Sequence, residues 1–190
     1  MPDKYCYPGT DILINKFNIR DDLILQDMER QITSARQAEI LTADVIDFDF
    51  SYFKYIHKKM FSDIYNWAGI PRTIILQKGN SLFCLPEYIN KNAKIIFGNL
   101  KKDNFLRESN KSDFIHKLSQ YMAEINFLHP FREGNGRTQR IFYIKLCNEA
   151  GFDIFFNKID RGLLIHADIM AMNGNDDVLK EILFEIVEKI

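Results

Sequence analysis

Residues 129–140 read His129-Pro130-Phe131-Arg132-Glu133-Gly134-Asn135-Gly136-Arg137-Thr138-Gln139-Arg140. This segment brings a base, a carboxylate, an amide, glycines and arginines together within twelve residues.

Helices are predicted on both sides of this segment. Before it, apolar residues recur at three- and four-residue steps, as on one face of a helix: Phe114, Ile115, Leu118, Tyr121, Met122 and Ile125. Ser112 is the predicted N-cap, and Pro130 disfavours helical backbone at His129, where this helix should end. A second helix is predicted over residues 135–150, with Gly151 at its C-terminal cap. The segment is thus predicted to form a loop that leads into a helix N-terminus.

This predicted arrangement suits the binding of an anion. A helix N-terminus has unpaired N–H groups and a partial positive charge. Gly134 and Gly136 let the backbone approach a ligand without a Cβ in the way. Arg137 and Arg140 are three residues apart and so lie near one face of the first turn. Two guanidinium groups beside free N–H groups suit a polyphosphate.

Two further side chains complete the predicted chemistry. Glu133 offers an oxygen to Mg²⁺, which proteins bind through one or two carboxylates plus substrate phosphates. His129 can accept a proton near neutral pH. Taken singly, a histidine is more often a surface or core residue, a charged side chain usually faces solvent, and Gly-x-Gly is usually a turn. Their concentration in one loop favours a site that handles phosphate.

The pattern His-Pro-Phe-x-Glu-Gly-Asn-Gly-Arg-x-x-Arg resembles the complete signature of the Fic family (filamentation induced by cAMP). Residues 5–11 resemble the N-terminal opening of bacterial Fic toxins, and residues 61–69 and 78–84 resemble family segments before and within the flap. The resemblance extends from Tyr5 to Asn173. It implies a mainly α-helical bundle with a short β-hairpin flap over the active site.

The resemblance also implies an activity, protein adenylylation. AMP would pass from ATP to a Ser, Thr or Tyr hydroxyl of a target protein, and pyrophosphate would leave. His129 would be the catalytic base that takes the proton from the hydroxyl. Glu133 would hold Mg²⁺, the expected cofactor, between the α- and β-phosphates. Pro130 and Phe131 would be structural, with Phe131 as an apolar anchor under the loop.

Five residues are expected to bind ATP, the cosubstrate. The N–H groups from Gly134 to Gly136, together with the Asn135 side chain, would bind the oxygens of the α-phosphate. Arg137 and Arg140 would clamp the β- and γ-phosphates.

Residues 73–84 carry the one clear strand signal. Residues 73–76 and 82–84 flank a turn-forming segment, Lys78-Gly79-Asn80-Ser81, which predicts a hairpin. The hairpin is either a cover for the helical core or, as the resemblance implies, a flap whose unpaired edge binds an extended stretch of the target. The Lys78 side chain suits either a solvated turn or a ligand contact. The predicted target-binding residues are Ile74, Ile75, Leu76, Lys78 and Gly79.

The sequence also indicates how the site is regulated. Many Fic proteins are inhibited by the glutamate of a [Ser/Thr]-x-x-x-Glu-[Gly/Asn] helix, which pairs with the second arginine of the signature, here Arg140. The only glutamate of this chain followed by Gly or Asn is Glu133, inside the signature itself. No glutamate of the predicted C-terminal helix fits the pattern: Glu181, Glu185 and Glu188. We therefore expect a separate small antitoxin to supply the inhibitory glutamate; a degenerate helix within the chain is the alternative.

The resemblance suggests a toxin that acts on cell division or DNA topology, with bacterial topoisomerase subunits as targets. Other activities stay open. A Doc-like kinase carries lysine where this chain has Gly136, which argues against that activity. Other Fic proteins transfer UMP or phosphocholine. A metal hydrolase would need His129, Glu133 and a second histidine, and the other histidines are far from these in sequence: His57, His116 and His166. A non-catalytic interaction module is the last alternative.

Composition sets the remaining limits. The chain has 190 residues, 46% of them hydrophobic, and a net charge of −1, which gives no support for binding nucleic acid or an anionic membrane. Three widely spaced cysteines favour a reducing compartment over a disulfide framework. The polar N-terminus lacks the apolar core of a signal peptide, and no run is long enough for a membrane span, so we expect a cytoplasmic protein. The sequence leaves a homodimer open.

A single Fic domain is predicted to span residues 1–190. Residues 1–49 would form an N-terminal arm and helix, residues 50–173 the core, and residues 175–190 a C-terminal helix. The helices expected besides the two described above cover residues 21–45, 50–65, 86–101, 160–172 and 176–190.

Overall fold

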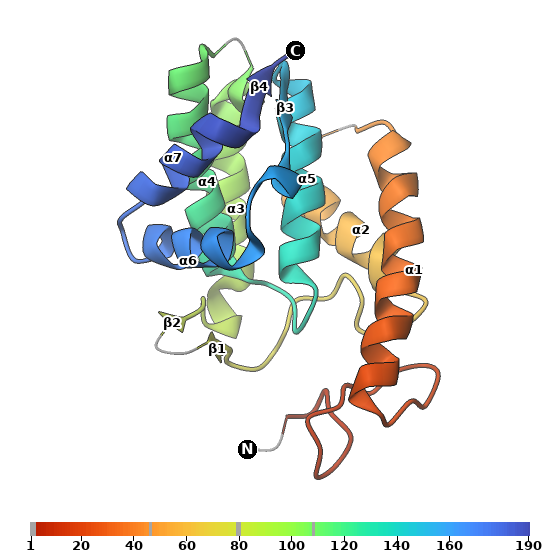
Figure 1. Ribbon diagram of the computed structural model, residues 1–190. Helices are drawn as coiled ribbons and strands as arrows, with labels where there is room; N and C mark the ends of the chain where they lie inside the picture. The colour runs from red at the N-terminus through yellow and green to blue at the C-terminus, as the bar shows by residue number, and fades with distance from the viewer. Residues whose placement is uncertain (1–2, 46, 79–80, 108) are drawn as a thin grey trace.

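The computed structural model describes residues 3–45, 47–78, 81–107 and 109–190 of the chain. This part is built mainly from helices (Figure 1). The helices are α1 (Asp22–Thr42), α2 (Phe50–Phe61), α3 (Ile89–Lys102), α4 (Lys111–Leu128), α5 (Asn135–Glu149), α6 (Arg161–Met172) and α7 (Asp177–Ile186). Short 3-10 turns cover Pro86–Tyr88, Asn104–Leu106 and Phe156–Lys158. The strands are β1 (Gln77–Lys78), β2 (Ser81–Leu82), β3 (Phe152–Ile154) and β4 (Val187–Lys189). The mainly α fold with a small hairpin is confirmed.

Side-chain caps fix where several helices begin. Asp21 Oδ1 accepts a hydrogen bond from the N–H of Ile24, 3.0 Å away, at the start of α1. Asn110 Oδ1 does the same for the N–H of Asp113, also at 3.0 Å, at the start of α4. The prediction of Ser112 as the cap of that helix was therefore wrong, because the Asn110 amide two residues earlier satisfies the first turn.

Helices α4 and α5 form the centre of the molecule. Helices α3, α6 and α7 pack against α4, while α1 and α2 pack against α5 (Figure 1). Their contact surfaces are apolar and fully buried, with side chains such as Phe53, Ile56, Leu118, Leu128 and Phe142 below 1% exposed. The loop between α4 and α5 lies at the same end of the molecule as the hairpin (Figure 1).

The hairpin is shorter than predicted. Strand pairing joins Gln77 to Leu82 and Lys78 to Ser81, and residues 73–76 and 83–84 lie outside the strands. One more backbone hydrogen bond joins the flanks, from the N–H of Phe83 to the carbonyl of Leu76 at 3.2 Å. Beyond it the partners differ, because the carbonyl of Ile74 accepts from Arg72 and the N–H of Cys84 donates to the carbonyl of Phe127 in α4. The hairpin is thus tied at its base to the end of α4.

The C-terminal segment also differs from the prediction. Helix α7 ends at Ile186, and the next residues form β4, which pairs antiparallel with β3. The expected helix through residue 190 was wrong there. The predicted helices over residues 21–45 and 50–65 end at Thr42 and Phe61 instead. None of the helices in the described part of the chain combines the length and apolar character that a membrane span requires.

Candidate active site

His129 lies at the end of α4, with its backbone in the left-handed region (φ 38°, ψ 60°). Its Nδ1 is 3.3 Å from the carbonyl oxygen of Asn126. A carbonyl only accepts hydrogen bonds, so in the neutral ring Nδ1 carries the hydrogen and Nε2 is the basic nitrogen. The ring stacks on Phe83, with 3.8 Å between ring centroids. The predicted base is therefore oriented by both α4 and the base of the hairpin.

Asn135 closes the loop that follows His129. Its side chain is 2% exposed, its Oδ1 accepts from the N–H of Phe131 at 2.9 Å, and its Nδ2 donates to the carbonyl of Phe131 at 2.8 Å. Phe131 is fully buried and stacks on Phe53 and His57, which confirms it as an apolar anchor. The Asn135 side chain is thus occupied in shaping the loop, and its contact with a phosphate stays a prediction.

The two glycines of the loop differ in how much space their surroundings leave for a side chain. Gly134 has a φ of +82°, and a Cβ there would lie 2.4 Å from Cζ of Phe61, so only glycine fits. A Cβ on Gly136 would meet no atom within 4 Å. Gly136 lies in the first turn of α5, where N–H groups have no acceptor within the helix. The N-terminus of α5 is therefore open to a ligand.

His57 fixes this loop from below and was missed as a site residue. Its Nδ1 accepts from the N–H of Gly69 at 2.8 Å, so its Nε2 carries the hydrogen and donates to the carbonyl of Glu133 at 2.9 Å. The ring is completely buried, and burial lowers its pKa from 6.5 to about 3. His57 is thus a neutral bridge between the loop and the segment after α2.

Arg72 connects the hairpin to the same loop and was also missed. It is 2% exposed, and its guanidinium donates to the carbonyls of His129, Ile74 and Cys84 at 2.8, 2.7 and 2.6 Å. Its own N–H donates to the carbonyl of Pro130 at 2.7 Å. Burial lowers the pKa of Arg72. Neither Arg72 nor His57 belongs to the signature, and both act through contacts between distant segments.

Glu133 is the predicted metal ligand. Its half-exposed carboxylate accepts from the N–H of Gly134 at 2.8 Å through Oε1, which also lies 3.5 Å from the Arg137 guanidinium. No cluster of three or more metal-binding side chains occurs in the described part of the chain. One carboxylate beside an open helix N-terminus fits Mg²⁺, which takes most of its ligands from water and phosphate.

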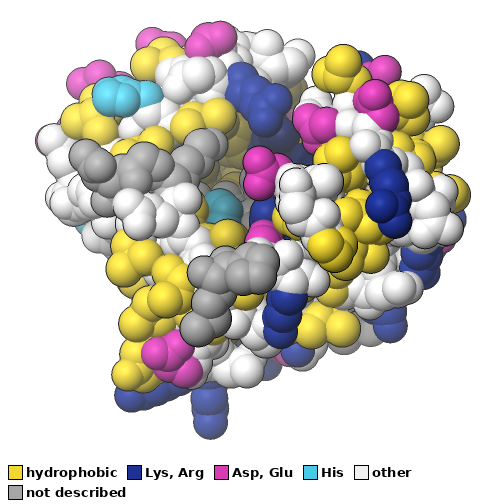
Figure 2. All heavy atoms as spheres, turned by 90° about the horizontal axis from the view of Figure 1, so that it is seen from below, with side chains coloured by type: hydrophobic (Ala, Val, Ile, Leu, Met, Phe, Trp, Pro, Cys, Tyr) yellow, Lys and Arg dark blue, Asp and Glu magenta, His cyan; other side chains and the backbone are white. Residues whose placement is uncertain are grey.

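Two adjoining cavities meet at the N-terminus of α5. One, of about 390 Å³, extends from His129 along α6 and has apolar walls that include Met122, Phe156 and Leu164. The other, of about 610 Å³, extends toward α1. Both are lined by Arg132, Glu133, Gly136, Arg140 and Arg161. Figure 2 shows this face, where a hollow contains histidine, acidic and basic side chains.

The cationic side chains of these cavities are not equivalent. Arg137 pairs with Glu29 of α1. Within the described residues, the guanidinium groups of Arg140 and Arg161 make no ion pair or hydrogen bond. Burial and the neighbouring Arg161 and Arg137 lower the pKa of Arg140. Two cations held close together without a bonded acid are suited to an anionic ligand. Arg161 begins α6, outside the signature, so its place in the site could not be predicted.

The N-terminal arm contacts the same region. Asp3 pairs with Arg132 across 2.6 Å, and Tyr5 packs edge-on against Trp67. The hydroxyl of Tyr5 accepts from the N–H of Thr73, 3.2 Å away, just before the hairpin. The arm that the sequence describes as irregular is thus bound to the catalytic loop and to the hairpin.

The predicted target-binding residues occupy different positions. Ile75 is 62% exposed, Leu76 lines the cavity beside His129, and the carbonyl of Ile74 is held by Arg72. The backbone of Lys78 belongs to β1. Gly79 lies outside the described residues.

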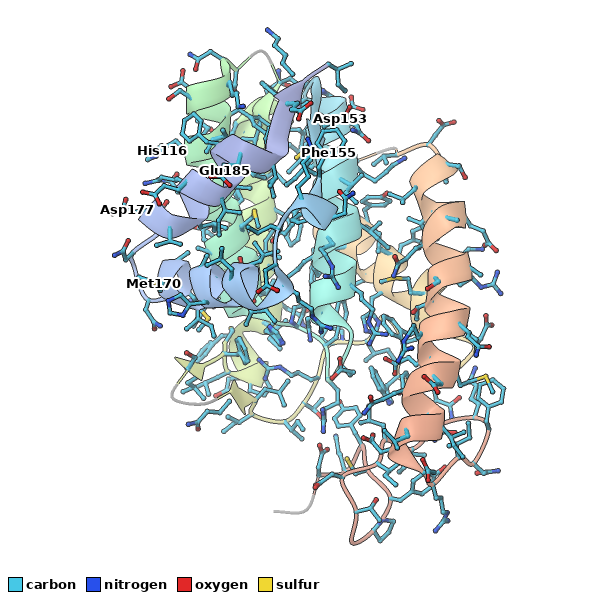
Figure 3. The ribbon with its side chains drawn as sticks, in the orientation of Figure 1. His116, Asp153, Phe155, Met170, Asp177 and Glu185 are labelled. Carbon is cyan, nitrogen blue, oxygen red and sulfur yellow. The ribbon has the colours of Figure 1, made fainter. Side chains whose placement is uncertain are left out.

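Among the described residues, no histidine joins the loop in a group of three or more side chains that could hold a metal ion. His57 uses both ring nitrogens in hydrogen bonds. His116 lies on α4 toward the end of the molecule opposite the hairpin (Figure 3). These positions do not support a metal hydrolase. Glu185 on α7 lies toward that far end too (Figure 3).

Comparison with known proteins gives one consistent result. A profile of the Fic/DOC family matches residues 47–147. The probable protein adenylyltransferase y4lH of Sinorhizobium fredii is 38% identical over 91% of this chain and 90% of its own length. The probable protein adenylyltransferase Fic of Escherichia coli is 32% identical over 98% of this chain and 93% of its own.

A solved structure agrees with these sequence matches. The crystal structure of BepC from Bartonella tribocorum with bound AMPPNP superimposes with a TM-score of 0.91 at 26% identity, covering 98% of this chain and 97% of that one. The predicted nucleotidyltransferase class agrees with the names of the sequence relatives. The signature loop, the helical fold and these matches together show that the chain belongs to the Fic/DOC family.

Proposed function

We propose that this chain is a protein adenylyltransferase that transfers AMP from ATP to a Ser, Thr or Tyr hydroxyl of a target protein. One observation carries the proposal: His129, Glu133, the open N-terminus of α5 and Arg140 all line a single cavity of about 390 Å³. A base and an anion-binding helix end in the same cavity suit the attack of a hydroxyl on a phosphate. The names of the relatives and the AMPPNP in BepC support the choice of ATP.

In the proposed reaction, the target hydroxyl loses its proton to Nε2 of His129. Its oxygen forms a bond to the α-phosphorus, and the bond from that phosphorus to the bridging oxygen of the β-phosphate breaks. The N–H groups at the start of α5 stabilise the charge on the α-phosphate oxygens. Mg²⁺ held by Glu133 would neutralise charge on the α- and β-phosphates. Arg140 binds the two phosphates that leave as pyrophosphate. The apolar walls of the cavity near Phe156 and Leu164 suit the adenine ring of ATP.

Incubation of the protein with Mg²⁺ and ATP labelled at the α-phosphate, in a bacterial lysate, tests this proposal. Label on a protein band, absent with the His129→Ala variant, is the expected result. The same experiment with γ-labelled ATP should leave protein unlabelled, and transfer of γ-label would instead mean a kinase. Transfer from UTP or CDP-choline but not from ATP would mean a Fic transferase with another cosubstrate, and no binding of any nucleotide would leave an interaction module.

We further propose that the protein is a cytoplasmic toxin inhibited by a separate antitoxin, whose glutamate pairs with Arg140. Two features support this: Arg140 makes no ion pair within the described residues, and Glu188 lies on β4 beside β3, which follows the far end of α5. Arg140 is nine residues before the end of α5, which corresponds to about 14 Å along the helix. The purified chain should therefore be active without truncation. If the purified chain is inactive and deletion of residues 175–190 makes it active, the proposal of a separate antitoxin is contradicted.

Topoisomerase subunits are the first targets to test, because the resemblance points to effects on DNA topology and cell division. Purified bacterial topoisomerase subunits should take the α-label and lose topoisomerase activity. If no topoisomerase subunit is labelled but another protein of the lysate is, that other protein is the target, and the proposed reaction still holds.

A further inference from the structure

Glu29 lies in the middle of α1, outside the part of the chain that matches the family profile. Although it is an acid on a surface helix, it is only 8% exposed, and it lines the cavity of about 610 Å³ beside α5. Both carboxylate oxygens have partners. Oε1 accepts from Nη2 of Arg137, and Oε2 accepts from the Tyr65 hydroxyl at 2.5 Å. A buried carboxylate is stable only when it is paired in this way.

Arg137 is held on three sides by these contacts. Its guanidinium pairs with Glu29, lies 3.5 Å from Oε1 of Glu133, and sits over the ring of Phe61 with 4.8 Å to the centroid. Arg140, one turn further along α5, makes no ion pair within the described part of the chain. The two signature arginines are therefore held differently: Arg137 is fixed by a bonded carboxylate, whereas Arg140 interacts with Asp168 only through its charge.

The second partner of Glu29 makes its position rigid. Tyr65 is 1% exposed and stacks on Trp67 with 4.4 Å between centroids. The hydroxyl of Tyr65 therefore cannot follow a rotation of the Glu29 side chain without disturbing packed rings. Burial and the nearby Glu29 carboxylate raise the pKa of Tyr65, so its hydroxyl remains a donor at neutral pH. A rigid carboxylate can determine the rotamer of a long arginine side chain.

We propose that Glu29 is a positioning residue, which orients Arg137 so that the remaining donors of its guanidinium and the adjacent Glu133 face the phosphates of the nucleotide. The inference rests on the proposed function and assigns it a residue on α1. Glu29 would thereby make the N-terminal helix a required part of the nucleotide site. Its effect should appear in nucleotide affinity, because Glu29 acts through Arg137 and not on the reacting hydroxyl.

If Glu29 opposed nucleotide binding, its removal would change the nucleotide affinity in the opposite direction. If Glu29 instead competed with phosphate for Arg137, removing its charge would strengthen nucleotide binding. Glu29→Gln keeps the shape and an acceptor for Tyr65 but removes the charge that holds Arg137. If Glu29 positions Arg137, this variant should raise the dissociation constant for Mg·ATP about tenfold, as expected for the loss of one charged hydrogen bond.

Calorimetric binding of Mg·ATP and of Mg·pyrophosphate, in a His129→Ala background that cannot turn over, measures this effect. Glu39→Gln is the matched control, because Glu39 is also on α1 and ion-paired, with Arg36 and Lys59, but lines neither cavity. Steady-state kinetics of the same substitutions with His129 intact should show a raised KM for ATP and a kcat changed less than about threefold. Unchanged or tighter binding in Glu29→Gln, with the control also unchanged, would overturn the inference.

Tyr65→Phe provides a second variant in case Glu29→Gln fails to fold. It removes only the hydroxyl that fixes Oε2, so it should weaken Mg·ATP binding in the same direction by a smaller factor; tighter binding would again overturn the inference. The pyrophosphate measurement separates the two proposals. If no AMP is transferred but Glu29→Gln still weakens Mg·pyrophosphate binding, the proposed reaction fails and the role of Glu29 stands.

Discussion

Nε2 of His57 donates a hydrogen bond to the carbonyl oxygen of Glu133, 2.9 Å away, although the two residues are 76 positions apart. The loop that carries the predicted base and metal ligand therefore depends on a histidine that must remain neutral. Burial holds the pKa of His57 at about 3, well below the 6.5 of an exposed imidazole.

Stability should consequently depend on pH through His57. Between about pH 6.5 and pH 3 the unfolded chain binds a proton at this position and the folded chain does not, so the free energy of unfolding falls as the pH is lowered. The loss should reach up to about 3 kcal/mol between pH 7 and pH 4. Urea unfolding at several pH values measures it. His57→Gln should flatten this part of the profile, whereas His116→Gln, at an exposed position, should keep it; equal slopes in all three proteins would contradict the buried neutral state.

Gly136 should be required for binding and not for folding. A Cβ there meets no protein atom within 4 Å, and alanine favours helix over glycine by up to about 1 kcal/mol. Gly136→Ala should therefore leave Tm unchanged or raised while weakening Mg·ATP binding about tenfold or more, because the methyl group occupies ligand space.

Gly134→Ala is the matched contrast to this change. Its Cβ would clash with Phe61, and its φ of +82° is strained for alanine, so Tm itself should fall. Normal nucleotide binding by a folded Gly136→Ala protein would mean that the phosphates do not approach the start of α5.

Arg161 should act as a binding residue outside the signature. It lines both cavities next to Arg140, whose pKa it lowers by charge repulsion. Arg161→Gln should therefore leave Tm unchanged or slightly raised and weaken Mg·ATP binding about tenfold, an effect that shrinks as salt is added. Lys158→Gln is the control, since Lys158 lies three residues earlier and pairs with Glu188. If both substitutions weaken Mg·ATP binding to a similar extent, the effect comes from the general surface charge and not from a contact of Arg161 with the nucleotide.

Asp168 should make stability respond to pH in the opposite direction to His57. Burial on α6 raises its pKa from 3.8 to about 7, against the opposing effect of Arg140. The folded chain then binds a proton that the unfolded chain lacks, so this residue lowers stability as the pH rises from 4 to 7. Asp168→Asn should stabilise the protein at pH 8 by up to about 4 kcal/mol and have little effect at pH 4. Thermal unfolding at both pH values measures the difference, and equal effects at pH 4 and pH 8 would contradict it.

The sequence predicts this fold well where the signal is local. The apolar period from Phe114 to Ile125 and the proline after His129 correctly place α4 and its end, because both act through the backbone of neighbouring residues. Gly151, with a φ of +85°, follows α5 as a glycine cap should. The loop between these helices was predictable for the same reason.

The supporting contacts are not local and were not predictable. Arg72, His57 and Glu29 reach the signature loop from 57 to 108 residues away in the sequence. Nothing in their own neighbourhoods distinguishes them from ordinary surface or core residues. The short strand β4 was missed because its hydrogen-bond partner, β3, is more than 30 residues earlier, and its apolar pattern continues that of α7.

One arginine joins the hairpin and the predicted base. Arg72 holds the carbonyls of Ile74, Cys84 and His129 with a single planar group, so the three segments cannot move independently. If a target strand docks along the hairpin, as the resemblance to the family implies, its register there fixes which hydroxyl comes opposite His129. Arg72 would then set a fixed spacing, so the number of residues between the docked strand and the modified side chain would be the same in every substrate.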